Sequence, residues 1–259
     1  MNNEELTAAA QLLPSERLDY LLTHDLSIIQ SSEVFSFSMD AVLLARFASV
    51  PSKGRIMDLC TGNGVIPLLM STRTKADIDG IEIQPRLADM AQRSVKINEL
   101  DNRIHIIEGD LKTFQPTGER PYYDLVTVNP PYMPLSTGDP KENMHYAMAR
   151  HEVACTLEDV IRTCSRLVQP GGKVAMVHRP SRLIDIITLM RAYRLEPKRI
   201  RFIHPRLNGE ANMVLIEAAR DGKPELRLLP PLIVYNDDNT YCKELMDIYY
   251  GEASQLKDG

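Results

Sequence analysis

The sequence predicts an α/β domain with a mostly parallel sheet and helices on both of its faces. Two observations lead to this prediction. After residue 50, short strand-like runs alternate with segments of helical spacing, and the alternation ends in two strands joined by a short link. The chain has 259 residues, of which 44% are hydrophobic and 25% charged, so it can bury a sizeable core without disulfides or metal.

The strands and helices are predicted from their periodicity. Short apolar or alternating runs indicate parallel strands at 55–60, 77–83, 103–108, 123–128 and 173–177. Helical spacing indicates helices at 64–73, 85–100, 157–168 and 183–193. The sequence Gln-Pro-Gly-Gly at 169–172 is expected to end the third helix. The closing strands are expected at 199–204 and 212–218, which would place one antiparallel strand at the sheet edge.

The segments before and after this alternating region are predicted to pack onto the domain that it forms. Residues 1–50 are interpreted as an N-terminal extension with a helical start and a strand near 26–30. Residues 51–220 form the predicted main domain. Residues 221–259 form a tail rich in proline and then tyrosine, which is expected to return to the core.

Composition narrows the cellular setting. No apolar run approaches the roughly 20 residues that cross a bilayer, and the start lacks a basic-then-apolar signal pattern. The four cysteines form no C-x-x-C pair, and no histidine cluster has metal-ligand spacing. We therefore expect a cytoplasmic protein with free thiols and no metal site.

The charge distribution is uneven. The net charge is −5, but residues 160–206 carry +9 and the rest of the chain carries −14. A basic block on an acidic protein favours a polyanionic partner that meets one face, such as nucleic acid. The alternative, solvated arginines on helix surfaces, stays open at this point.

The first motif with chemical content follows the first predicted parallel strand. It reads Asp58-Leu59-Cys60-Thr61-Gly62-Asn63-Gly64, and its glycines allow a tight turn and close approach of a ligand. The third glycine of the dinucleotide fingerprint is replaced by Pro67, which disfavours a nicotinamide dehydrogenase. The acid before the loop would repel a pyrophosphate and attract a cationic ligand group.

Two further acids follow the next predicted strands. Glu82 lies 20 residues after Gly62 and is placed to accept hydrogen bonds from ribose hydroxyls. Asp110, after Gly109, is placed to accept from an adenine amine. Each acid alone is unspecific, but the carboxyl ends of parallel strands meet in one crevice, so Asp58, Glu82 and Asp110 together indicate an adenosine site.

The most specific motif is Asn129-Pro130-Pro131-Tyr132, after the fourth strand. Two prolines make the chain rigid and remove backbone donors. Asn129 and the carbonyl of Pro130 can then serve as fixed acceptors for an amine, and Tyr132 offers a face for stacking a planar base. As an isolated tetrapeptide this would be an ordinary turn with a buried tyrosine.

Together these motifs resemble the class I S-adenosylmethionine-dependent methyltransferases with an N-P-P-Y motif. The resemblance extends over residues 33–220. The segment Phe35-Ser36-Phe37-Ser38-Met39-Asp40-Ala41 also resembles the element that closes over the cofactor in the tRNA1(Val) adenine-37 N6-methyltransferase family. It implies a Rossmann-like, seven-stranded sheet whose last strand is antiparallel. The cofactor contacts that it implies are Phe37, Ser38, Asp40, Asp58, Cys60, Thr61, Gly62, Asn63, Gly64, Glu82, Ile83, Asp110 and Asn129.

The resemblance implies methyl transfer to the N6 amine of an RNA adenine, most specifically adenine 37 of tRNA(Val). The catalytic group is Asn129, Pro130, Pro131 and Tyr132. The candidate RNA contacts are Tyr132, Arg150, His151, Arg179, Arg182, Arg199, Arg201, His204 and Arg206. Methylation of guanine N2, of DNA adenine or of a release-factor glutamine uses the same motif and remains an alternative, as does a non-catalytic module that binds adenosine ligands or RNA.

Overall fold

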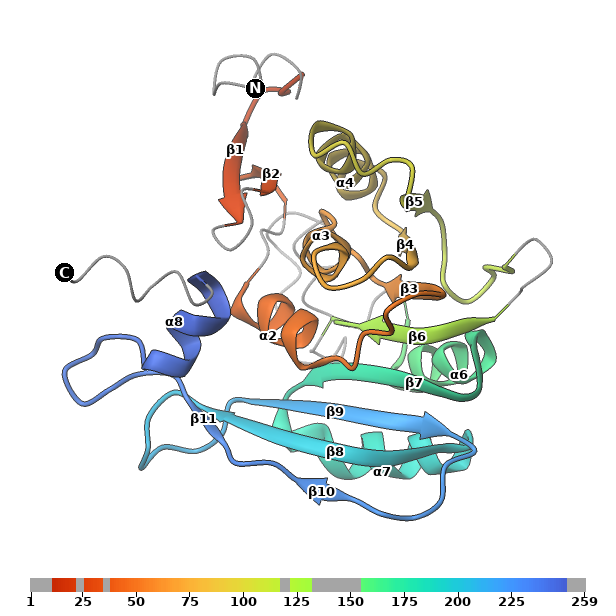
Figure 1. The fold of residues 1–259 in the computed structure, drawn as a ribbon, viewed down its shortest axis with the longest axis vertical. Coiled ribbons are helices and arrows are strands. Elements are labelled where there is room, and N and C mark those ends of the chain that lie inside the picture. Colours follow the sequence, from red (N-terminus) through yellow and green to blue (C-terminus); the bar gives the residue numbers. More distant parts are fainter. Residues whose placement is uncertain (1–10, 22–25, 35–37, 117–121, 132–154, 251–259) are drawn as a thin grey trace.

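Nine strands of the described residues form the central sheet (Figure 1). The computed structural model describes residues 11–21, 26–34, 38–116, 122–131 and 155–250. The order across the sheet is β10-β8-β9-β7-β6-β3-β4-β5, and β11 also pairs with β8. The strands are β3 (Arg55–Leu59), β4 (Asp77–Glu82), β5 (Ile104–Glu108), β6 (Tyr123–Val128), β7 (Val168–His178), β8 (Leu195–His204), β9 (Met213–Arg220), β10 (Arg227–Leu228) and β11 (Leu232–Ile233).

The strand directions confirm the predicted fold class, but the sheet has nine strands instead of the expected seven, because β10 and β11 of the tail pair with β8. Strands β3 to β7 pair in parallel, and β9 runs antiparallel to both β7 and β8. The expectation that the antiparallel strand lies at the edge is wrong, because β9 lies between β7 and β8. Residues 214–218 of β9 are buried in succession, which is typical of an interior strand covered on both faces.

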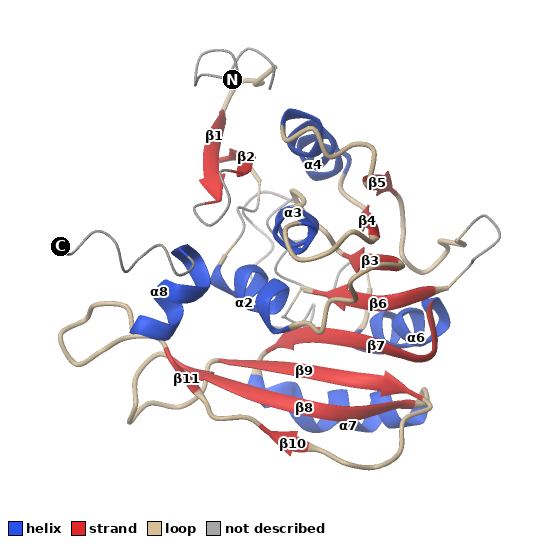
Figure 2. Ribbon diagram, viewed as in Figure 1, coloured by secondary structure: helices blue, strands red, loops and turns tan. Residues whose placement is uncertain are grey.

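Helices cover both faces of the sheet, as predicted (Figure 2). The helices are α2 (Met39–Phe47), α3 (Val65–Ser71), α4 (Pro85–Ile97), α6 (Leu157–Leu167), α7 (Leu183–Ala192) and α8 (Lys243–Tyr250), with the short 3-10 helix η2 (Pro180–Arg182). Helices α2, α3 and α8 share one apolar core with the sheet, and α6 and α7 share the other. Within the described ranges, no helix is long and apolar enough to cross a membrane.

Strand β7 begins earlier than predicted. Helix α6 ends before the Gln-Pro-Gly-Gly segment, as expected, but the strand already starts at Val168 instead of residue 173. Val168 pairs with Tyr123 and Lys173 pairs with Leu125, so the intervening residues form an irregularity in the ladder. Gly171 has a φ of +77°, which suits such a bulge. The Gln-Pro-Gly-Gly segment therefore ends α6, but it lies within β7 instead of preceding it.

The N-terminal extension contains a hairpin of β1 (Glu16–Leu21) and β2 (Leu26–Ser31). The predicted helical start is therefore wrong for residues 16–21, and residues 1–10 lie outside the described ranges. Helix α4 anchors β2, because Ser94 Oγ accepts from the Ile29 N–H at 3.0 Å and Asn98 Oδ1 accepts from the Ser27 N–H at 2.9 Å. The local sequence of residues 16–21 favours a helix, but their pairing with the anchored β2 makes them a strand.

The tail packs against the sheet and α2 over its described part. Strand β11 pairs with the end of β8, and α8 contacts α2. Leu232, Val234 and Leu245 are buried in the core that contains α2 and α3. The division of the chain at residues 50 and 220 stays an interpretation of the sequence.

Candidate adenosyl-cofactor site and catalytic corner

The loop after β3 has the backbone shape that the glycines predicted. Gly62 and Gly64 have φ values of +57° and +88°, in the region where glycine carries no steric penalty. A Cβ on Gly64 would lie 3.2 Å from Ala91 Cβ on α4, so this glycine lets α3 and α4 approach. A Cβ on Gly62 would meet nothing within 4 Å, so Gly62 presents open space. Open space beside a bare backbone suits close approach by a ligand.

Asp58 lies fully buried at the end of β3. Its carboxylate accepts from Thr61 Oγ1 at 2.7 Å and from Thr127 Oγ1 at 2.6 Å. The pKa of Asp58 is raised to about 7: burial is the main cause and the nearby Glu82 carboxylate adds to it, while the two threonine hydrogen bonds oppose the rise. The bond to Thr127 ties the glycine loop to β6. The sequence analysis missed Thr127, although it is the one threonine of β6.

Glu82 ends β4 directly across from this loop. One carboxylate oxygen accepts from the Gly62 N–H at 2.9 Å and the other from the Gln84 N–H at 3.0 Å. Burial raises the pKa of Glu82, and these backbone hydrogen bonds oppose the rise. Beside it, Ile83 is 41% exposed, which leaves an apolar face at the same edge. Glu82 therefore also holds the glycine loop in place, a role that its spacing in the sequence did not reveal.

Asp110 lies after β5, the neighbour of β4. Asp110 Oδ1 accepts from the Lys112 N–H at 2.9 Å, and Asp110 Oδ2 lies 3.4 Å from Lys112 Nζ. The carboxyl ends of β3, β4 and β5 thus bring Asp58, Glu82 and Asp110 to one edge of the sheet, as predicted. We refer to the edge at which β3 to β7 end as the carboxyl edge.

Three other predicted cofactor residues have side chains with internal partners. Asn63 Nδ2 donates to the Ile29 carbonyl of β2 at 3.1 Å, and Thr61 donates to Asp58. The pKa of the Cys60 thiol is raised by the nearby Cys155 thiol and by burial. Any cofactor contact by Asn63 or Thr61 would therefore be made by backbone atoms. Among the described residues, no group of three histidine, cysteine or acidic side chains is placed to hold a metal ion.

The segment before and at the start of α2 is described only in part. Phe37 lies outside the described residues. Ser38 precedes the helix, and its hydroxyl donates to Asp40 Oδ1 at 2.5 Å. Asp40 is buried and also accepts from the Ala41 N–H at 2.8 Å. Ser38 and Asp40 thus fix the start of α2.

The predicted catalytic corner follows β6 directly. Asn129 is partly exposed and Pro130 is buried, two residues beyond Thr127 and its bond to Asp58. Pro131 completes the described part, and Tyr132 lies outside it. Because β3 and β6 are adjacent and parallel, the corner and the glycine loop leave the sheet side by side. The structure therefore places the diproline corner next to the predicted cofactor loop.

The end of β7 adds a buried histidine, His178, that was not among the predicted site residues. Burial lowers the pKa of His178 to about 4, with Arg182 and Arg179 nearby, so its ring is neutral at pH 7. Its Nδ1 accepts from the Arg179 N–H at 2.8 Å. Arg179 is exposed at the carboxyl edge.

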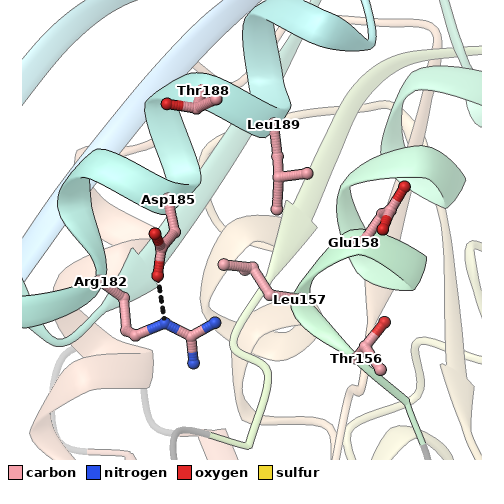
Figure 3. Close-up of a pocket in the computed structure, with 7 residues that line it drawn as sticks. All are labelled: Thr156, Leu157, Glu158, Arg182, Asp185, Thr188 and Leu189. Carbon is pink, nitrogen blue, oxygen red and sulfur yellow. Dashed lines mark hydrogen bonds and ion pairs between the residues drawn. The ribbon is translucent and has the colours of Figure 1, made fainter.

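Arg182 lies next to a cavity of about 440 Å³ between the starts of α6 and α7 (Figure 3). Its Nε lies 3.0 Å from Asp185 Oδ2, and Thr156, Leu157 and Glu158 line the opposite side. This cavity is separate from the glycine loop and Glu82, which do not line it.

Two of the remaining predicted RNA contacts, Arg199 and Arg201, are held in ion pairs. Arg199 is largely buried in an ion pair with Glu217 at 3.0 Å and stacks over Phe47, so its geometry favours a structural role over the predicted RNA contact. Arg201 pairs with Glu244 at 2.7 Å, which also favours a structural role.

The other predicted contacts lie elsewhere or are not described. His204 Nδ1 contacts the Gly209 carbonyl at 2.8 Å, and Arg206 is exposed beyond the end of β8. Arg150 and His151 lie outside the described residues.

Comparison with protein families identifies relatives over most of the chain. The methyltransferase small domain model matches residues 25–190. The tRNA1(Val) (adenine(37)-N6)-methyltransferase of Aeromonas hydrophila is 30% identical over 81% of this chain and 86% of its own length. The enzyme of the same name from Aeromonas salmonicida is 31% identical, with coverage of 70% and 75%. That from Parabacteroides distasonis is 32% identical, with coverage of 69% and 74%.

Solved structures share the fold. A predicted O-methyltransferase from Agrobacterium tumefaciens matches with a TM-score of 0.64 at 25% identity, over 82% of this chain and 96% of that one. Geranyl diphosphate C-methyltransferase from Streptomyces coelicolor, solved with S-adenosyl-L-homocysteine, matches with a TM-score of 0.53 at 15% identity, over 70% and 76%.

These likenesses agree with the glycine loop, the acids at the carboxyl edge and the diproline corner. The family model and the relatives establish an S-adenosylmethionine-dependent methyltransferase, and the solved structures show its class I fold. The chain belongs to the methyltransferase small domain family and, within it, to the family of the tRNA1(Val) (adenine(37)-N6)-methyltransferases.

Proposed function

We propose that this enzyme methylates the exocyclic N6 amine of adenine 37 in the anticodon loop of a tRNA(Val), in the cytoplasm. The observation that carries the proposal is the Asn129-Pro130-Pro131 corner, which leaves β6 next to the cofactor loop and is tied to it through Thr127 and Asp58. The names of the three relatives described above support the choice of base and RNA.

The residues at the carboxyl edge fit an adenosyl cofactor. Gly62 provides open space at a bare backbone, and Glu82 has carboxylate lone pairs that ribose hydroxyls can use in addition to its bonds to the backbone. The exposed part of Ile83 offers an apolar face for the adenine, and Asp110 is an acceptor for its amine. When bound, the cofactor supplies a methyl group that its sulfonium activates for transfer.

The corner then acts on the target amine by position and electrostatics. An exocyclic adenine amine is a weak nucleophile, because its lone pair is delocalised into the ring. The Asn129 side-chain carbonyl and the Pro130 carbonyl would accept its two N–H bonds and direct the lone pair outward. In this proposal Tyr132 stacks the flipped base, which returns about 1–3 kcal/mol and offsets unstacking from a single-stranded loop.

The RNA backbone is proposed to lie across the carboxyl edge. Arg179 and Arg182 follow β7 there. His204 ends β8 and Arg206 follows it, and β8 runs in the same direction as β7 because β9 is antiparallel to both. Arg150 and His151 remain proposed contacts from the sequence. Binding through several phosphates should weaken steeply as salt rises.

The test is Asn129→Ala, with Asn208→Ala in an exposed turn as the matched control. Both purified variants are incubated with labelled cofactor and unmodified tRNA(Val) transcript, and cofactor affinity is measured separately by calorimetry. We expect Asn129→Ala to lose at least roughly a hundredfold in turnover, by analogy with the loss of one oxyanion-hole donor in other enzymes, with cofactor affinity retained. Wild-type turnover in Asn129→Ala, or label on guanine, DNA or a protein glutamine only, would contradict the proposal.

A further inference from the structure

Two tyrosines of the C-terminal tail stack on each other between β11 and α8. Tyr235 and Tyr241 form an antiparallel bridge, and their ring centroids lie 5.1 Å apart with 23° between the ring planes. The Arg206 guanidinium lies over the Tyr235 ring, 5.8 Å from its centroid, and donates to Asn239 Oδ1. We refer to Arg206, Tyr235 and Tyr241 as the aromatic stack. It lies outside residues 25–190, which the family model matches.

A network of hydrogen bonds fixes the turn that carries the two tyrosines. The Asn236 N–H donates to the Thr240 carbonyl at 2.9 Å, and Asn236 Nδ2 donates to Thr240 Oγ1 at 3.0 Å. The Tyr235 N–H donates to the Pro205 carbonyl at 3.0 Å, which ties the turn to the end of β8. The two rings are therefore held in place before any ligand binds, so a ligand that stacks on them costs little side-chain entropy.

Tyr241 presents the accessible part of the stack. Its side chain is 47% exposed, whereas Tyr235 is half-buried. A rigid aromatic face of this kind suits another planar ring, and every nucleobase has such a face. Arg206 is exposed and adds a positive charge beside the rings. Asp237 and Asp238, at the tip of the same turn, disfavour a phosphate there, so the ring face and Arg206 are the parts that suit a nucleotide.

The aromatic stack lies beyond the carboxyl edge, where the catalytic corner also lies (Figure 1). Strand β11 is parallel to β8, β8 has the direction of β7, and β7 is parallel to β6. Across the sheet, β8 is separated from β6 by β9 and β7. At about 4.8 Å between neighbouring strands, β8 and β6 are roughly 15 Å apart. A single-stranded loop of a few nucleotides can cover such a distance.

We propose that the aromatic stack is a docking site for an unpaired nucleobase of the substrate RNA, a few nucleotides from the base that is methylated. The docked base lies on the exposed face of Tyr241, and its phosphate lies on the side of Arg206. The identity of this RNA as tRNA(Val) rests on the proposed function. Loss of one base–aromatic stack should weaken RNA binding by roughly fivefold to a hundredfold.

The experiment measures the affinity of the full-length protein for the anticodon stem–loop RNA of tRNA(Val), by fluorescence anisotropy at several salt concentrations. Tyr241→Leu should bind it roughly fivefold to a hundredfold more weakly, whereas Tyr241→Phe keeps the ring and should keep the wild-type affinity. Stacking releases no counterions, so Tyr241→Leu should retain the wild-type slope of affinity against salt. The matched control is Tyr122→Leu, which removes a tyrosine that is 51% exposed just before β6, at the opposite edge of the sheet, and should bind as wild type does.

A second probe is an RNA duplex that contains the stem but no unpaired base. Wild type and Tyr241→Leu should bind this duplex equally, because only the backbone is available to both. An equal loss for duplex and stem–loop would overturn the proposal, as would wild-type affinity of Tyr241→Leu for the stem–loop. A loss in Tyr241→Phe as large as that in Tyr241→Leu would also overturn it, because the effect would then belong to the hydroxyl. Tyr241→Trp keeps an aromatic ring and should bind at least as tightly as wild type.

Methyl transfer to the same stem–loop separates this proposal from the proposed function. If the wild type methylates adenine 37 and Tyr241→Leu binds the RNA as tightly as wild type, the docking site is wrong and the proposed function stands. If binding depends on the Tyr241 ring but the wild type transfers no methyl group to adenine 37, the proposed function is wrong and the docking site stands. If the wild type does not bind the stem–loop, both are overturned.

Discussion

The buried carboxyl of Asp58 makes a prediction about how stability depends on pH. Its pKa is raised from the ordinary 3.8 to about 7 in the folded protein, chiefly by burial. A raised carboxyl pKa means that the folded state holds the proton more tightly than the unfolded state. The stabilising contribution is complete below pH 3.8 and is lost as the pH rises through about 7.

The magnitude follows from the shift. Three pKa units at about 1.4 kcal/mol each correspond to a maximum of roughly 4 kcal/mol. Two of these units lie between pH 5 and pH 7, so roughly 3 kcal/mol should be lost over that interval. Asp58→Asn keeps the shape and can hydrogen-bond to Thr61 and Thr127, but it has no charge to bury.

The assay is urea unfolding without cofactor at pH values from 5 to 8. The unfolding free energy of Asp58→Asn relative to wild type should rise by roughly 3 kcal/mol across this range. Asp77→Asn, on exposed β4 surface, is the matched control and should show no such trend. A constant difference between Asp58→Asn and wild type, or one that shrinks as pH rises, would refute the reasoning.

Three further substitutions test other parts of the account. Gly62→Ala should lower the unfolding free energy by about 1 kcal/mol, because residue 62 has a left-handed φ. It should also weaken cofactor binding measured by calorimetry, and an unchanged affinity would count against the loop as the cofactor site. Arg199→Met should lower the unfolding free energy measured in urea by about 3–5 kcal/mol, because it leaves Glu217 buried without its main partner. The tRNA affinity of the folded variant should stay at the wild-type value. A selective loss of RNA binding would instead support the predicted RNA contact of Arg199. Thr156→Ala removes the capping box of α6 and should lower the unfolding free energy by about 1 kcal/mol, and no change in urea midpoint would argue against that cap.

The sequence was most informative where a pattern is local. The bounds of β6 match the predicted strand at 123–128, and the acids after β3, β4 and β5 meet at one edge because parallel strands all end there. The diproline corner is equally local, since prolines restrict the chain wherever they lie.

Long-range partners were the part that the sequence could not supply. The basic block at 160–206 pairs mostly with acids from outside it, including Glu217 with Arg199, Glu244 with Arg201 and Asp221 with Arg194. Charge counted along a segment therefore overstated the positive charge that the folded surface offers.

The same limit explains the other differences. Residues 16–21 pair with a strand that α4 anchors, and β9 is inserted between β7 and β8. Within the site, the bond from Gly62 to Glu82 and that from Thr127 to Asp58 join residues far apart in sequence, and no spacing rule indicates them.

The most direct test of the central claim is nucleoside mapping of tRNA(Val) from cells that lack this protein. We predict that N6-methyladenosine disappears from position 37, returns on expression of the wild-type chain, and does not return on expression of Asn129→Ala. Retention of the modification at position 37 in the deleted cells would contradict the account.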